Sequence, residues 1–175
     1  MNIRETLIRN RTKYTCEKIV DYIGDSTEHV KEWADCFLRP DFILNQKAAW
    51  VLHFITDFNP YIVDSYQQLF LNKLFEPNIH DAVIRAICRH WGNYGYPEKI
   101  EGEVYDVCLN YLQSNVSISI KAHAMFACFR LINKYPELGL ELKLVLEEIL
   151  LKYGEDSAAL RSSGNKILRK LKPYL

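Results

Sequence analysis

The sequence is short of the residues that break helices, with seven glycines and six prolines among 175 residues. It also lacks any stretch in which apolar and polar residues alternate for long enough to predict a convincing β-strand. The glycines and prolines lie between segments whose apolar residues recur at helical spacing. The two absences together predict an all-α protein.

Neither charge is in excess, because 22 Lys and Arg residues balance 22 Asp and Glu residues. No overall field therefore attracts nucleic acid or a membrane surface. No apolar run approaches the roughly 18 residues that a membrane span needs, and residues 1–14 lack the apolar core of a signal peptide. We therefore expect a cytoplasmic protein with no membrane partner. The sequence gives no indication of its oligomeric state.

Cysteine pairs and catalytic motifs are also missing. An odd number of cysteines without a CxxC pair argues against a disulfide framework, a zinc knuckle or a dithiol redox pair. No HExxH, GxSxG, Walker or GxGxxG pattern occurs. We expect no metal, no cofactor and no catalytic residue. Helices can bring distant carboxylates together, so the sequence does not exclude an enzyme that uses a pair of acids. The cysteines, expected to be buried as small apolar residues, are Cys16, Cys36, Cys88, Cys108 and Cys128.

What the sequence does contain is helical periodicity. After Pro136, for example, apolar residues continue at i, i+4, i+7 and i+8, which is typical of an amphipathic helix. Gly24 and the Asn59-Pro60 and Tyr135-Pro136 pairs predict breaks. The pattern predicts about nine helices, at residues 12–23, 26–38, 42–58, 61–75, 80–92, 100–114, 117–134, 137–153 and 157–171.

A basic residue followed by a small one recurs four times, at spacings of 38, 36 and 40 residues. In the three complete units a proline follows 12–15 residues later, and a second amphipathic helix follows the proline. Two helices per roughly 40 residues is the period of HEAT and armadillo repeats. One helix pair cannot bury its own apolar face, so such units must stack. The members of this basic column are Lys47, Arg85, Lys121 and Arg161.

The stretch Asp81-Ala-Val-Ile-Arg85-Ala86 resembles the opening of the second helix of a HEAT unit, and Ile120-Lys121-Ala122 is similar without the Asp. The resemblance covers about residues 42–175. It implies a right-handed α-α superhelix, an α-solenoid of HEAT-like two-helix repeats. We expect a single domain over residues 1–175, with capping helices at 1–41, repeats at 42–79, 80–115 and 116–154, and a capping helix at 155–175.

The basic column has two interpretations. In HEAT-like families such a cation commonly bonds an acid of the adjacent repeat, which predicts an internal ladder. The alternative is a ridge of cations that binds an acidic partner. The distribution of charge among the helices supports retaining this alternative. Residues 117–134 and 157–172 carry eight basic and no acidic residues, whereas residues 98–115 and 137–153 are net acidic. Since the resemblance places the helices that start near the column on the concave face, we expect that face to be basic in the C-terminal half.

Two polar-aromatic clusters could form a site or simply fill packing gaps. Trp50, His53 and Asp57 share one helical face at i, i+3 and i+7. Arg89 and Trp91 lie near the end of a later helix, and aromatic residues interleaved with cations can stack nucleic-acid bases. The same residue types fill gaps between repeats.

Two functions follow from these patterns. The first is a non-catalytic binding or scaffold module that holds a protein or peptide on its concave face. The second is a nucleic-acid-binding protein with a basic concave groove, related to DNA alkylation repair, because HEAT-like DNA alkylpurine glycosylases have a similar repeat type. That resemblance assigns no catalytic residue here. The candidate binding residues are Lys47, Trp50, His53, Asp57, Arg85, Arg89, Trp91, Lys121 and Arg161.

Overall fold

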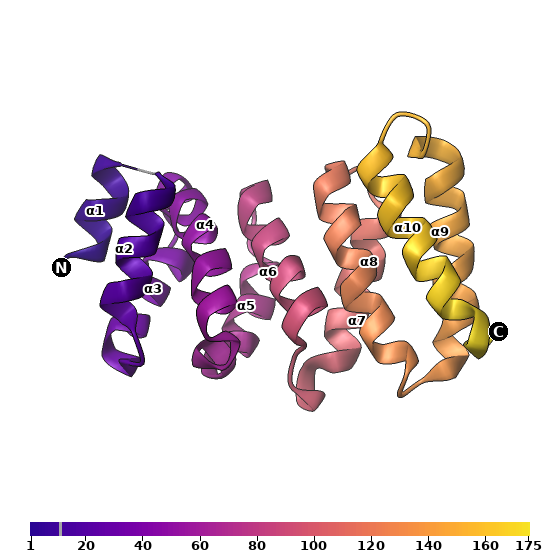
Figure 1. The fold of residues 1–175 in the computed structure, drawn as a ribbon, viewed down its shortest axis with the longest axis horizontal. Coiled ribbons are helices and arrows are strands. Elements are labelled where there is room, and N and C mark those ends of the chain that lie inside the picture. The colour runs from indigo at the N-terminus through magenta and orange to yellow at the C-terminus, as the bar shows by residue number, and fades with distance from the viewer. Residues whose placement is uncertain (11) are drawn as a thin grey trace. The chain divides into compact units, whose positions relative to one another are not determined.

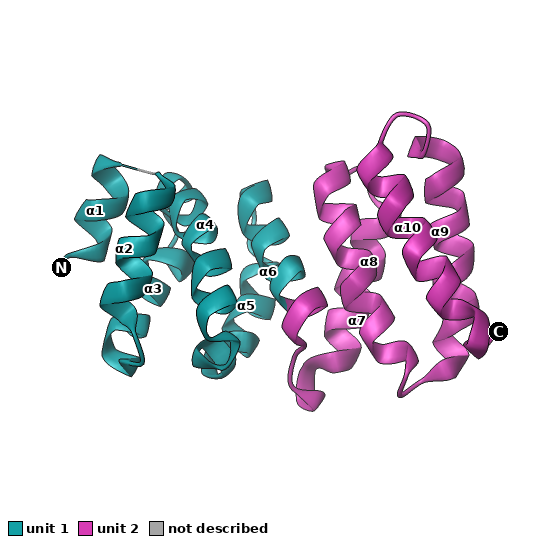
Figure 2. Cartoon of the chain, viewed as in Figure 1, with its two compact units in different colours: residues 1–90 teal, residues 91–175 magenta. Residues whose placement is uncertain are grey.

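The computed structural model describes residues 1–10 and 12–175, and every regular element in this part of the chain is a helix (Figure 1). The all-α prediction is therefore confirmed. The helices form two compact units, residues 1–90 and residues 91–175 (Figure 2). None of the described helices is both long and apolar enough to cross a lipid bilayer.

Unit 1 begins with helices whose first turns are capped by side chains. The side-chain oxygens of Asn2, Thr12, Ser26 and Asp41 each accept a backbone N–H of the following turn, which satisfies a donor that has no partner within the helix. The elements are α1 (Ile3–Arg9), α2 (Lys13–Ile23), α3 (Thr27–Leu38), α4 (Phe42–Phe58), the 3-10 helix η1 (Pro60–Tyr66), α5 (Gln67–Lys73) and α6 (Asp81–Tyr94), whose last turn belongs to unit 2.

The core of unit 1 centres on α4, which packs against both α2 and α3. The Trp33 side chain is fully buried, and its indole N–H donates to the carbonyl of Ala48 on α4 at 3.1 Å. The rings of Phe37 and Phe70 lie edge to face, with centroids 5.3 Å apart, and both contact Trp33. This aromatic cluster ties α3, α4 and α5 together.

Unit 2 is built from two helix pairs arranged in two layers. Helix α8 packs against α10, and α7 packs against α9. The chain alternates between the layers, so that consecutive helices also contact each other. The elements are η2 (Glu98–Ile100), α7 (Glu101–Gln113), α8 (Ile118–Ile132), η3 (Pro136–Leu138), α9 (Gly139–Tyr153), α10 (Ala158–Leu171) and η4 (Lys172–Tyr174).

The described residues form ten α-helices, where the pattern predicts about nine. Helix α1 was not predicted, because seven residues with few apolar positions carry little periodic signal. It is nevertheless anchored, since Ile3 and Leu7 are fully buried and the Ile3 N–H donates to Glu32. The helix predicted at 61–75 is divided into η1 and α5, with Pro60 starting the tight first segment. All five cysteines are buried, as expected.

In unit 2, a lysine and a tyrosine that follow α8 contact two glutamates near the start of α7. The Lys134 ammonium lies 2.6 Å from a carboxylate oxygen of Glu98 and 2.6 Å from one of Glu101. The Tyr135 hydroxyl donates to Glu101 at 2.7 Å. These hydrogen bonds from Lys134 and Tyr135 lower the pKa of the Glu101 carboxyl below its ordinary value.

This lowered pKa predicts how the stability of unit 2 depends on pH. Because the folded pKa lies below the unfolded one, the stabilising contribution of Glu101 is present above the ordinary pKa of 4.5 and is lost as pH falls through the folded value. We expect Glu101→Gln to melt at a lower temperature than the wild type at neutral pH. The difference should shrink in thermal melts taken progressively below pH 4.5. A pH-independent difference would contradict this assignment.

Candidate functional site

The basic column does not form a ladder of ion pairs in the described structure. The Lys47 ammonium donates to the carbonyl of Ile8 at 2.8 Å. The Lys121 ammonium donates to the carbonyls of Tyr111, Leu112 and Ser114 at 3.2, 2.5 and 2.6 Å. Backbone carbonyls thus replace the expected acids, because each lysine reaches the end of an earlier helix instead of a neighbouring side chain.

Lys121 has a structural role at the end of α7. Its side chain is 2% exposed, and its three N–H donors are all used at the C-terminus of α7. A positive charge at this end of a helix is stabilised by the partial negative charge of the last carbonyls. Burial lowers the pKa of the Lys121 ammonium from its ordinary value.

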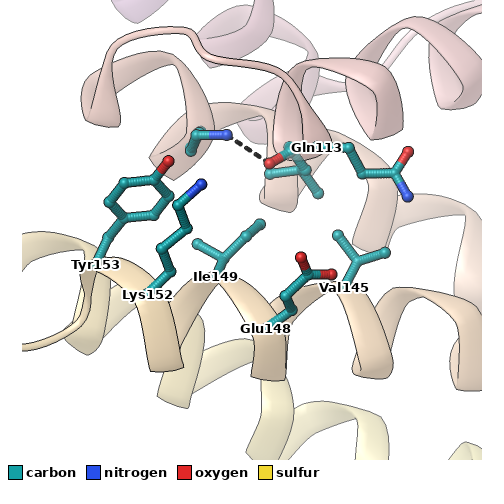
Figure 3. Close-up of a pocket in the computed structure, with 8 residues that line it drawn as sticks. Gln113, Val145, Glu148, Ile149, Lys152 and Tyr153 are labelled. Atoms are coloured by element: carbon teal, nitrogen blue, oxygen red, sulfur yellow. Dashed lines mark hydrogen bonds between the residues drawn. The ribbon is translucent and has the colours of Figure 1, made fainter.

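A small pocket of 190 Å³ opens beside this buried lysine (Figure 3). Its labelled side chains come from the end of α7 and from the second half of α9, with Val145 and Ile149 forming an apolar floor. Gln113, Glu148 and Lys152 supply polar groups of mixed charge at its rim. Because the Lys121 donors are already used, the pocket offers a ligand no cluster of one charge.

Three of the predicted site residues do meet, in unit 1. Trp50 and His53 on α4 and Arg85 on α6 line an open hollow of 240 Å³, which we call the α4/α6 hollow. Its remaining lining residues are Gln46, Ala49 and Ala82. The sequence signal for these three was weak: Gln46 and Ala49 share the helical face of Trp50 and His53, but nothing in the chain predicts that Ala82 lies opposite.

Arg85 is the feature that distinguishes this hollow. Its side chain is half-buried, and within the described chain its guanidinium makes no hydrogen bond or ion pair. The neighbouring Trp50 ring is held edge to face against Phe54, with centroids 5.8 Å apart and planes at 77°. The hollow therefore presents a fixed aromatic surface and five N–H donors that the protein itself does not use.

Asp57 and Arg89 lie on the same two helices but are joined to each other. One guanidinium nitrogen of Arg89 donates to both carboxylate oxygens of Asp57, at 3.0 and 3.2 Å. The pair links α4 to α6; the Arg89 side chain is 22% exposed and the Asp57 side chain 52%. An exposed pair of this kind contributes about 0–1 kcal/mol to stability. It positions α6 against α4 and leaves Arg85 as the available cation.

The other two predicted residues lie elsewhere. Trp91 is fully buried in unit 2, where its ring packs edge to face on Tyr96 with centroids 6.2 Å apart. The Tyr96 hydroxyl donates to the carbonyl of Ala127 at 2.8 Å, and burial raises the pKa of that hydroxyl. Trp91 thus packs in the core of unit 2. Arg161 is exposed in the first turn of α10.

The predicted charge split between helices appears in unit 2 as a split between its two layers. Helices α8 and α10 contain six basic and no acidic residues, whereas α7 contains three acidic residues and no base. On α9, Glu141, Glu147 and Glu148 outnumber Lys143 and Lys152. Since α8 contacts α10 and α7 contacts α9, one layer is basic and the other acidic.

The chain matches a family model described as a HEAT repeat domain over residues 3–171. No curated protein and no solved structure matches the chain. The match extends the predicted resemblance, which covered residues 42–175, to the N-terminal helices.

Proposed function

Because this chain belongs to the HEAT-repeat family and is an α-solenoid, we propose that it is a non-catalytic scaffold that holds a protein or peptide partner. Stacked helix pairs offer an extended surface for such partners. The observation that carries the proposal is the Arg85 guanidinium, which is half-buried in the α4/α6 hollow and has no partner in the described chain. We take a cytoplasmic location as part of the proposal, because buried thiols suit a reducing compartment.

The size of the hollow suits one side chain of a partner. At 240 Å³ it is smaller than the roughly 300–1,000 Å³ of pockets that enclose drug-sized molecules. Arginine and tryptophan are the residue types most enriched among binding hot spots. The planar guanidinium can receive a carboxylate through two parallel hydrogen bonds. We therefore propose that Arg85 binds an Asp or Glu of the partner while Trp50 packs against its aliphatic stem.

The test is a selection of peptides from a random library on the wild-type protein. We expect the selected peptides to share an acidic residue, and we expect Arg85→Gln to weaken their binding roughly 10- to 30-fold, as for loss of a hot-spot contact. Arg161→Gln is the matched control, because it removes an exposed arginine that likewise has no partner among the described residues. Affinities would be measured by fluorescence anisotropy.

The outcomes separate clearly. Peptides without a common acid, or binding that Arg85→Gln leaves unchanged, would refute the α4/α6 hollow as the binding site. Equal losses in Arg85→Gln and Arg161→Gln would show that only general charge is recognised. The nucleic-acid alternative concerns a different surface, the basic layer of unit 2.

A further inference from the structure

Five of the six basic residues on α8 and α10 are exposed, and the sixth is buried. Lys121 is buried and capped. The Arg130 guanidinium is exposed, and one of its nitrogens donates to the carbonyls of Gly92 and Asn93 at 3.3 and 3.2 Å, which fixes its position. On α10, Lys166 and Lys170 are exposed one helical turn apart.

Each of these two lysines lies over an aromatic ring of α8. The Lys166 ammonium is 5.8 Å from the centroid of Phe126, and the Lys170 ammonium is 5.6 Å from that of Phe129. Attraction between an ammonium and a ring restricts the lysine side chain. Phe126, Phe129 and Arg130 share one face of α8 at i, i+3 and i+4. We call these five residues the α8/α10 cation surface.

The positions of the ammonium groups determine which partner fits. Four residues of helix rise by about 6 Å, so the two lysines repeat at one turn of an α-helix. Carboxylates at i and i+4 on a partner helix repeat at the same distance. Because the rings already restrict the lysines, less side-chain entropy is lost on binding.

We propose that the α8/α10 cation surface docks an acidic helical segment of a protein partner, with carboxylates one turn apart. This site is separate from the α4/α6 hollow and does not depend on it. The helices α8 and α10 contain no acid, so they attract the acidic segment, whereas the acidic α7/α9 layer of the same unit repels it. This difference directs the segment to one layer.

Nucleic acid fits the same surface less well. Proteins that bind duplexes through the backbone commonly make about 6–10 phosphate contacts. This surface has three cations, Arg130, Lys166 and Lys170, and α8 and α10 together expose five. Base stacking needs an open ring face, and an ammonium lies over each of the two rings.

The test uses a fluorescein-labelled peptide of about 20 residues, long enough to form a helix in water, with Glu at every fourth position and Ala and Gln between. Anisotropy titrations at about 50 and 200 mM salt would compare it with the same peptide carrying Gln for Glu and with single- and double-stranded DNA. We expect the acidic peptide to bind, and Lys166→Gln with Lys170→Gln to weaken it roughly 5- to 10-fold, as for loss of two exposed charge pairs.

The matched control is Lys143→Gln with Lys152→Gln, which removes the same charge from α9 in the acidic layer. It should change the affinity less than about twofold, because neither lysine lies on the docking surface. Circular dichroism would verify that both variants stay folded. No binding at low salt, equal losses in the two variants, or tighter binding of DNA than of the peptide would each overturn the proposal. Loss of peptide binding in Arg85→Gln but not in Lys166→Gln with Lys170→Gln would place the peptide in the α4/α6 hollow and would also overturn the proposal, so the two sites are distinguished.

Discussion

Replacing Lys121 by methionine should lower the free energy of unfolding of unit 2 by about 2–4 kcal/mol. Methionine fills a similar volume but cannot donate, so the carbonyls of Tyr111, Leu112 and Ser114 lose a charged partner at the end of α7. Each buried carbonyl left without a donor costs about 1–3 kcal/mol, partly offset because burying the ammonium is itself costly. In thermal melts we expect the midpoint to fall by roughly 5–15 °C.

Lys166→Met is the control for this measurement. It makes the same chemical change at an exposed position of the same unit, and we expect a change within about 0.5 kcal/mol. If Lys121→Met were as stable as the wild type in urea unfolding followed by circular dichroism, the ammonium would not be stabilising the end of α7. This stability measurement also bears on function. If Lys121→Met is destabilised, a loss of binding in this variant reports a folding defect; if it is as stable as the wild type, the loss reports a binding site.

Replacing Trp91 by alanine should destabilise the protein still more, by about 3–5 kcal/mol. The Trp91 ring is fully buried, and its removal leaves a cavity beside Tyr96, whose hydroxyl is fixed by the carbonyl of Ala127. Neighbouring rings that are held by such contacts cannot easily collapse into the space. Urea denaturation would show a midpoint shift, and expression of the variant would fall.

Trp50→Ala provides the comparison, since Trp50 is only half-buried and lines the α4/α6 hollow. It should cost less stability than Trp91→Ala but weaken binding of peptides selected on the wild type. Equal stability losses for the two substitutions would mean that Trp50 is a core residue. The two tryptophans are thus assigned different roles that a single pair of denaturation curves can separate.

The sequence was most informative about helices and their charges. Breaks at Asn59-Pro60 and Tyr135-Pro136 end helices α4 and α8 close to the predicted positions, because proline and the residue before it act locally. The split of charge between the layers of unit 2 could also be predicted, since a count of acids and bases per helix needs no knowledge of contacts.

The roles of the basic column could not be predicted in the same way. Lys47, Arg85 and Lys121 occupy equivalent positions in the repeat. Lys47 and Lys121 donate to backbone carbonyls, whereas Arg85 lies in a hollow and has no partner in the described part of the chain. Which group each cation contacts depends on where an earlier helix ends. The packing of many residues determines that position. The pairing of Lys166 with Phe126 likewise depends on contact between helices 40 residues apart in sequence.

Because all five cysteines are buried, their reactivity can be used to measure local unfolding. Cys16, Cys36 and Cys88 lie in unit 1, and Cys108 and Cys128 in unit 2. The thiolate is the reactive form, and burial raises the pKa of the Cys36 thiol to about 11, so a thiol reagent must wait for a local opening to modify it. Modification rates followed by mass spectrometry would therefore report the opening of each unit separately under native conditions. Comparing the modification rates of the two sets of cysteines would show whether the two units open in one cooperative step or independently.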